Sequence, residues 1–396
     1  MMELLLYLYI LIVVYLFFKY SRIRTLYIFS PYILIYLNFI FNDAIPFLFF
    51  YPDVPENIQY TTFTAAIINL SFLFLFRKQA QVPISINLPS SIELNKKRKI
   101  LLSCFVFFLL WAGVMSGVLI NLLRGNNIED LRRTSEIGVG VIRDIPMLGI
   151  QIIMLVLFLQ KTWKCYYKVV AFYSFCLSVF LFLTTGNKGG VLVGVTLFLL
   201  FFHLKKRGFK WYEYVLYYLA MPLAAGTLQG IRGGDLTLIA SQIAVFFSYP
   251  VILYQANSIP IMNAVGTENF FWGEEYYTGL VKFIPRFLWP DKPLSFDYKL
   301  KELANYDFEG GGIYTTLCND LYINFGYYYF IFYILWLLFI HYLYGMVMDD
   351  KRFYYSRIIA LFIILMGGIA STIGSCEILL LFLLFLILYY SRVKTL

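Results

Sequence analysis

The chain has 396 residues, of which 61% are apolar, 20% aromatic and only 14% charged, and its formal net charge is +9. A soluble globular domain is about half apolar and a quarter charged, so this chain carries more apolar surface than one soluble core can bury. The apolar residues form continuous runs and do not alternate with polar ones, which argues against membrane-spanning β-strands. The composition therefore predicts an all-α, polytopic integral membrane protein.

The apolar runs, of roughly 15–25 residues, match the length needed to cross about 30 Å of hydrocarbon. They predict about 11 transmembrane helices, at 4–18, 26–50, 60–76, 100–123, 145–160, 166–184, 190–204, 212–228, 314–345, 355–373 and 376–391. The first run has no basic segment before it and no small-residue cleavage site after it, which favours a membrane helix over a signal peptide. We expect residues 1–396 to form a single membrane domain.

Lysine and arginine clusters alternate along the chain with acidic or mixed connectors. By the positive-inside rule, the basic connectors face the cytoplasm, which places the amino terminus outside and the carboxyl terminus inside. A further apolar run, 237–254, then makes no net crossing, because the net acidic segment 255–313 faces outside and the run 314–345 returns the chain to the cytoplasm. We expect 237–254 to be re-entrant, interfacial or an even number of passes. A large outer loop region is therefore predicted at 229–313.

The cysteines and histidines do not indicate a metal site. The five cysteines are scattered, no CxxC or Cys/His cluster occurs, and the two histidines, His203 and His341, lie near predicted helix ends. No acidic metal cluster is recognisable either. We therefore expect neither a metal ion nor another cofactor.

The segment Ala256–Gly312 interleaves aromatic residues with charged ones, and this composition argues against disorder. Aromatic rings together with carboxylates and amides suit a carbohydrate, since sugar C–H faces stack on rings while the hydroxyls form hydrogen bonds. The same aromatic residues also suit a membrane interface, where Trp and Tyr gather. Composition alone leaves both interpretations open.

Two outward-facing cations stand among glycines directly before apolar runs. Lys188 lies in Thr185–Gly190 and Arg232 lies in Gln229–Asp235. Glycines let a backbone approach a ligand closely, and a following helix presents free N–H groups, so this pattern suits a phosphate or diphosphate. The alternative is that the glycines only shape turns while the cations extend towards the interface.

Three stretches of the chain resemble the Wzy-type polymerases of bacterial O-antigen and capsule repeat units. Thr185–Gly189 (Thr-Gly-Asn-Lys-Gly) is similar to the family's Thr/Ser-Gly-Ser-Arg-Gly stretch, with Lys where Arg is usual. Ile284–Pro293 is similar to its Pro-Arg-x-Leu-Trp-Pro-x-Lys-Pro block, the most specific of the three. Asp320–Gly326 (Asp-Leu-Tyr-Ile-Asn-Phe-Gly) is similar to the start of the family's next membrane helix, where Glu is commoner than Asp.

The resemblance implies a membrane glycosyltransferase in the bacterial inner membrane, with its active site facing the periplasm. Such an enzyme transfers a growing glycan from undecaprenyl diphosphate to the non-reducing sugar of a second lipid-linked repeat unit. The resemblance implies neither a nucleotide sugar nor a metal. The expected partners are the lipid-linked oligosaccharide donor and acceptor, the lipid bilayer and a polysaccharide chain-length regulator, with no nucleic acid.

This reaction assigns roles to residues in the three stretches and around them. Fixed cations stabilise the charge that develops on the leaving diphosphate, and a carboxylate accepts the proton of the acceptor hydroxyl. The candidate bases are Asp320, Asp291 and Glu274. The candidate binding residues for diphosphate and glycan are Arg232, Arg286, Lys188, Lys292, Tyr322 and Asn324. Asp320 and Asn324, four positions apart, share a face if this segment is helical. A loop cap is the alternative role for Asp291, and a solvated turn for Glu274.

Other functions fit parts of the pattern. An O-antigen ligase is expected to carry a histidine on its outer loop, and neither histidine lies there. A flippase or other transporter of lipid-linked oligosaccharides usually shows repeat symmetry and intramembrane charge, and the sequence has no recognisable internal repeat. If the protein were a non-catalytic scaffold of an export complex, Arg232 and Arg286 would have no assigned function.

Overall fold

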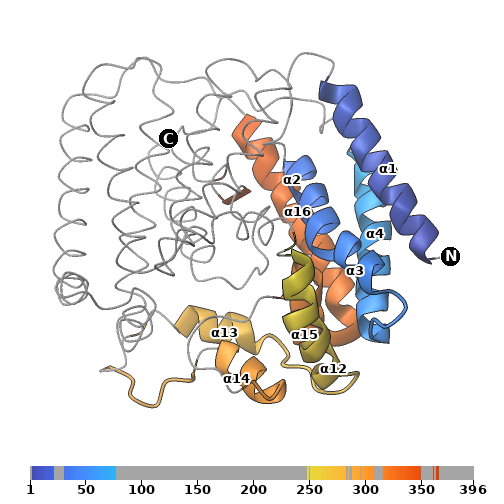
Figure 1. The fold of residues 1–396 in the computed structure, drawn as a ribbon. Helices are drawn as coiled ribbons and strands as arrows, with labels where there is room; N and C mark the ends of the chain where they lie inside the picture. Colours follow the sequence, from blue (N-terminus) through green and yellow to red (C-terminus); the bar gives the residue numbers. More distant parts are fainter. Residues whose placement is uncertain are drawn as a thin grey trace, which may run out of the picture. The chain divides into compact units, whose positions relative to one another are not determined.

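The structure, a computed structural model, describes residues 2–21, 31–76, 248–306 (except 249, 282–283, 285–287 and 295) and 315–348, together with 360, 363 and 364. These residues form helices and connecting turns, and they include no strand. By its internal contacts the chain divides into residues 1–85 with 248–396 and residues 86–247, and every described residue belongs to the first unit. The described part is all-α, as the composition predicts (Figure 1).

The N-terminal helices are α1 (Met2–Ser21), α2 (Pro31–Phe39), the π-helical turn η1 (Ile40–Ala44), α3 (Ile45–Phe50) and α4 (Glu56–Leu75). The later elements are the π-helical turn η4 (Tyr254–Ser258), α12 (Ile259–Val265), α13 (Glu274–Val281), α14 (Phe296–Leu303), α15 (Leu317–Phe325), the 3-10 turn η5 (Gly326–Tyr328) and α16 (Tyr329–Met348). Pro46 and Pro260 each lie just after a π-helical turn within continuous helix, where a proline removes one backbone hydrogen bond.

The observed helices refine several predicted boundaries. Helix α1 covers the predicted run 4–18, and α4 begins before the predicted start at residue 60. The described part of the run 26–50 is interrupted by η1. The chain stays helical through η4 and α12 to Val265, so the outer segment that we expected to begin at Ala256 begins with helix.

Two stretches of the described chain are long and apolar enough to cross a membrane, Glu56–Leu75 and Leu317–Val347. Helices α4 and α16 have 20 residues each, and a helix of that length is about 30 Å long, the thickness of the hydrocarbon layer. Both support the prediction of a membrane protein by length and composition.

The exposed apolar side chains of two helices add to this evidence. On α16 the exposed large side chains include Ile331, Leu335, Leu338 and Tyr342, and on α1 they include Leu4, Leu8, Leu11 and Tyr15. Both sets repeat at intervals of four, three and four positions, so each forms one stripe along its helix. Soluble monomers rarely expose continuous apolar stripes, whereas a helix in contact with lipid presents such a face.

Helices α15 and α16 form a hairpin instead of one continuous helix. Thr61 of α4 accepts a hydrogen bond at its carbonyl from Tyr329 Oη (2.7 Å), and its hydroxyl donates to Asn319 Oδ1 (3.1 Å). Cys318 and Tyr333 line one cavity, although fifteen residues of straight helix would separate them by about 22 Å. The chain reverses at Gly326, whose φ is +57°.

This hairpin corrects the expectation of a single helix over 314–345. With nine residues, α15 is about 13 Å long, less than half the hydrocarbon thickness. Helix α16 alone is therefore long enough for the crossing that the charge pattern requires there. We had expected a non-crossing element at 237–254. Most of that run lies outside the described residues.

Polar side chains join α4 to α16 inside the bundle. Tyr333 Oη donates to Asn69 Oδ1 at 2.9 Å, and both side chains are buried. Hydrogen bonds of this kind hold helices together where apolar surroundings offer no water as an alternative partner. Figure 1 shows α4, α15 and α16 side by side in this bundle, with α13 and α14 at the end where α15 and α16 are joined.

Candidate functional site

Helix α15 positions Asp320 and Asn324, the two candidate site residues of the Asp-Leu-Tyr-Ile-Asn-Phe-Gly stretch. Thr316 caps the helix by accepting a hydrogen bond from the Asn319 backbone N–H at 3.3 Å. Asp320 lies in the first turn and Asn324 one turn later, so they occupy one face, as the spacing predicts. Both side chains are buried. An acid and an amide therefore lie inside the protein on a helix too short to cross a membrane.

The polar helix α13 packs on this face of α15. Asn324 Nδ2 donates to Glu275 Oε2 at 2.8 Å and to the Asp320 carbonyl at 3.0 Å. The ring of Tyr276 stacks on that of Phe325, with ring centres 5.6 Å apart and ring planes 13° apart. The Phe271 N–H donates to the Ile323 carbonyl at 3.1 Å. These contacts join residues 271–276 to α15 at the candidate site.

Gly326 allows this packing at the tip of the hairpin. A Cβ atom at residue 326 would lie 2.6 Å from Cε2 of Phe270. Phe270 is itself fixed by edge-to-face contact with Tyr322, at 5.4 Å between ring centres. The glycine at the end of this stretch therefore serves two requirements, a positive φ and close contact with an aromatic ring.

The phenol of Tyr276 is a potential hydrogen-bond donor in this site. Burial raises the pKa of its phenol, and the negative charges of Asp320 and Glu275 raise it further. The phenol thus keeps its proton, and its oxygen is buried with no hydrogen-bond partner in the described part of the chain. Asn324 Oδ1 is likewise buried without a partner there. The hydrogen bonds of this amide group are both donated by Nδ2. The site thus contains an unsatisfied donor and an unsatisfied acceptor beside two carboxylates.

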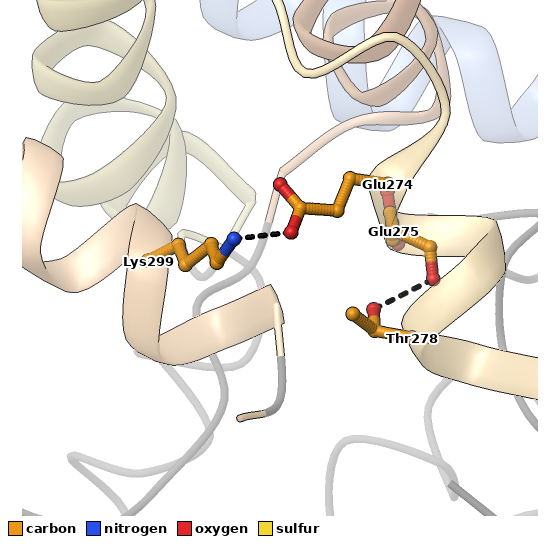
Figure 2. A network of polar contacts seen from close by, with 4 residues as sticks. All are labelled: Glu274, Glu275, Thr278 and Lys299. Carbon is orange, nitrogen blue, oxygen red and sulfur yellow. Dashed lines mark hydrogen bonds and ion pairs between the residues drawn. The ribbon is translucent and has the colours of Figure 1, made fainter. Parts of the chain in front are cut away.

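The two adjacent glutamates at the start of α13 have different surroundings. Figure 2 shows Glu274 in an ion pair with Lys299 of α14, and these side chains are 31% and 39% exposed. Glu275 instead contacts Asn324 of α15, and its backbone carbonyl accepts from the Thr278 hydroxyl at 2.9 Å. Glu274 was predicted from the sequence as a candidate base, whereas Glu275 was not predicted. The orientation of α13 determines which of the two glutamates faces α15, and this orientation cannot be predicted from two adjacent residues in the sequence.

The Glu274–Lys299 ion pair predicts a small effect for one substitution. We expect Glu274→Gln to change the free energy of unfolding by less than about 1 kcal/mol, because a partly exposed ion pair is screened by water and salt. Thermal unfolding at low and high salt measures this. A large destabilisation at both salt concentrations would contradict the assignment of Glu274 to a solvated contact.

The remaining predicted site residues lie elsewhere in the described fold or outside it. Tyr322 is fully buried and donates to the Gly266 carbonyl at 3.2 Å, a contact that fixes α12 against α15. Asp291 is exposed in a turn, and Lys292 Nζ donates to the Ile284 carbonyl at 2.8 Å. The predicted cations Lys188, Arg232 and Arg286 lie outside the described residues.

The cluster of Glu275, Tyr276, Asp320 and Asn324, which we call the α13–α15 cluster, combines carboxylates, an amide and a phenol. Such groups bind hydroxyl-rich ligands, and a carboxylate beside a bound hydroxyl can accept its proton. In the described part of the chain no group of three or more His, Cys, Asp or Glu residues is arranged to hold a metal ion. Comparison of the chain with known protein families, with curated proteins and with solved structures finds no match.

Proposed function

We propose that the protein is a membrane glycosyltransferase that polymerises undecaprenyl-diphosphate-linked oligosaccharide repeat units of a bacterial surface polysaccharide, O-antigen or capsule. The observation that carries the proposal is the α13–α15 cluster. Its unsatisfied phenol needs an acceptor and its unsatisfied amide oxygen needs a donor. A sugar hydroxyl is both donor and acceptor, so one such ligand supplies what both atoms lack.

In this proposal Asp320 is the catalytic base. It takes the proton of the acceptor sugar hydroxyl while the hydroxyl oxygen attacks the anomeric carbon of the donor glycan. The bond from that carbon to the diphosphate breaks, and undecaprenyl diphosphate leaves with its electron pair. Asp320 takes this role in preference to the other two candidate bases, Glu274 and Asp291, and Glu275 and Asn324 orient the acceptor.

The leaving diphosphate requires positive charge. Arg232, Arg286 and Lys188 are the proposed cations, with Lys292 as a further one, because guanidinium and ammonium groups stabilise a developing phosphate charge. Replacing Arg232 or Arg286 by alanine is expected to shorten or abolish the polysaccharide ladder at unchanged protein level. The proposed reaction takes place on the periplasmic side of the inner membrane, where no nucleotide sugar is present.

Access to the cluster requires movement of α13. The Tyr276 oxygen and Asn324 Oδ1 are buried in this structure. The hydrogen bond from Asn324 to Glu275 and the stacking of Tyr276 on Phe325 hold α13 in place. In the proposed cycle α13 is displaced when the acceptor sugar enters, so the outer segment acts as a lid over the site.

A deletion strain tests the class of function. Loss of the chain-length ladder with retention of single-repeat product, restored by the wild-type gene, is the expected result. Long chains that are made but not attached to the lipid core would identify a ligase. Loss of the single-repeat product as well would identify a transporter of lipid-linked units. Either of these results overturns the polymerase proposal.

A transporter of lipid-linked oligosaccharide is the second candidate function, and one observation favours it. Asp43 is buried in an apolar stretch, and ionisable groups at membrane depth are typical of transport pathways. The deletion strain described above separates this candidate from the first.

A further inference from the structure

A second polar site surrounds Asp43, which the π-helical turn η1 carries within an apolar stretch. Its side chain is 3% exposed. The Thr316 side chain, at the start of α15, hydrogen-bonds the carboxyl group, but the Oδ1 atom is buried with no hydrogen-bond partner among the described residues. Burial of an isolated charge is costly, so buried carboxylates are normally paired or fully hydrogen-bonded. Among the residues that the structure describes, no lysine, arginine or histidine pairs with Asp43. The question is therefore how this carboxyl group is stabilised without a cationic partner among the described residues.

A small cavity adjoins the Asp43 side chain. The space open to the centre of a water molecule is about 10 Å³, enough for roughly one water. The cavity is lined mainly by Asn38, Phe39, Asp43, Leu317, Cys318 and Tyr333. Since Asp43, Asn38 and Tyr333 bear polar atoms, one water there finds the two or more partners that a buried water needs.

A bound cation fits this cavity poorly. Hard cations take about six or more oxygen ligands. Only three side chains that line the cavity bear oxygen, those of Asn38, Asp43 and Tyr333. The other lining residues are apolar or, like Cys318, contribute sulfur. The lining therefore favours a proton over a cation as the means of neutralising the carboxyl group.

The start of α15 compensates an ionised Asp43 only in part, through one hydrogen bond from the Thr316 side chain and the helix dipole. Leu317 and Cys318 belong to its first turn, where the helix dipole favours negative charge. This effect is small beside the cost of removing a carboxylate from water. Among the described residues, the titratable side chains that interact electrostatically with Asp43 are those of Tyr9, Tyr254, Cys318, Tyr329 and Tyr333. They are phenols and a thiol, which are neutral at pH 7 and supply no positive charge.

The second π-helical turn carries the same kind of feature. Ser258 Oγ of η4 is buried without a hydrogen-bond partner among the described residues, and the buried Tyr254 hydroxyl of η4 lies beside the hydroxyl of Thr62 of α4. π-Helical turns occur frequently at functional sites. Both such turns in the described residues thus hold buried polar atoms with unmet hydrogen-bonding capacity.

From this geometry we propose that Asp43 is an internal proton-binding site, whose carboxyl group stays neutral in the folded protein and hydrogen-bonds one water in the adjoining cavity. The proton neutralises the carboxyl group, for which the described residues supply no counter-charge, and the water satisfies its Oδ1 atom. Since α15 starts at this cavity and also carries Asp320, release of the proton disturbs the helix that holds the candidate catalytic carboxylate. The proposal does not depend on the reaction that the α13–α15 cluster performs.

Infrared spectroscopy of the purified full-length protein in detergent tests the proposal directly. At pH 7 we expect a carbonyl band of a protonated carboxylic acid in the wild type, which is missing in Asp43→Asn and retained in Asp291→Asn, a substitution at an exposed acid. If the asparagine variant does not fold, the wild-type spectrum is compared with that of Asp43→Glu, which keeps a titratable group; an acid band that is the same in both does not belong to residue 43 and overturns the proposal.

Thermal unfolding as a function of pH gives an independent readout. An unfolded aspartate releases its proton near about pH 4, so a folded state that retains it binds more protons, and stability falls as pH rises above that value. One proton changes the unfolding constant by at most about tenfold per pH unit. We expect a flatter profile for Asp43→Asn. Absence of the acid band at pH 7, or stabilisation of the wild type by sodium ions that Asp43→Asn abolishes, would overturn the proposal.

Discussion

Asp320→Asn is expected to lower the rate of chain extension by roughly 10²–10⁴-fold, the usual contribution of a general base. Asparagine has nearly the size of aspartate, so α15 keeps its packing while the group that accepts the proton is lost. The measurement is the initial rate with lipid-linked repeat units and equal amounts of purified wild type and variant. Equal unfolding temperatures of the two proteins establish that the loss is chemical.

The two glutamates of α13 provide matched controls for this substitution. Glu274→Gln, at the exposed ion pair with Lys299, is expected to keep nearly the wild-type rate. Glu275→Gln is expected to raise the KM for the acceptor more than it lowers kcat, because Glu275 positions Asn324 and the acceptor without taking the proton. If Glu274→Gln loses as much activity as Asp320→Asn, or Asp320→Asn loses none, the site assignment is wrong.

Gly326→Ala is expected to destabilise the protein by about 2–5 kcal/mol. The backbone at Gly326 has φ +57° and ψ −139°, a conformation that is strained for any residue with a Cβ atom. The added Cβ would also lie 2.6 Å from the Phe270 ring, which Tyr322 and Trp272 hold by edge contacts. Folded yield and thermal unfolding in detergent measure the effect.

Gly345→Ala is the matched control on the same hairpin. Gly345 lies in α16, and a Cβ atom there meets nothing within 4 Å. Alanine is favoured over glycine inside a helix by roughly 0.5–1 kcal/mol, so this substitution is expected to be neutral or stabilising. Equal stability of Gly326→Ala and Gly345→Ala would show that the hairpin does not turn as described.

The sequence predicted those features that depend on local periodicity. The apolar runs predicted α1 and α4 closely, because helices of this length need only continuous apolar residues. The four-residue spacing of Asp320 and Asn324 correctly predicted one face of a helix. These features follow from the chain itself and do not depend on distant partners.

Features that depend on distant contacts were not predictable. The apolar run 314–345 hides the reversal at Gly326, because lipid and protein interior demand the same composition. Glu275 differs from Glu274 only in the direction in which α13 presents it to Asn324. Asp43 is a single acid in a long apolar run, and its isolation became visible only when its buried, unpartnered oxygen was seen.

The most direct test of the proposed polymerase is reconstitution of the purified protein in liposomes with undecaprenyl-diphosphate-linked repeat units from its own host. No nucleotide sugar and no divalent metal are added, and a chelator is present. The proposed function predicts a ladder of lipid-linked oligomers that grows with time in wild type and is missing in Asp320→Asn. Repeat units that remain monomeric while they cross the bilayer would contradict the polymerase and identify a transporter.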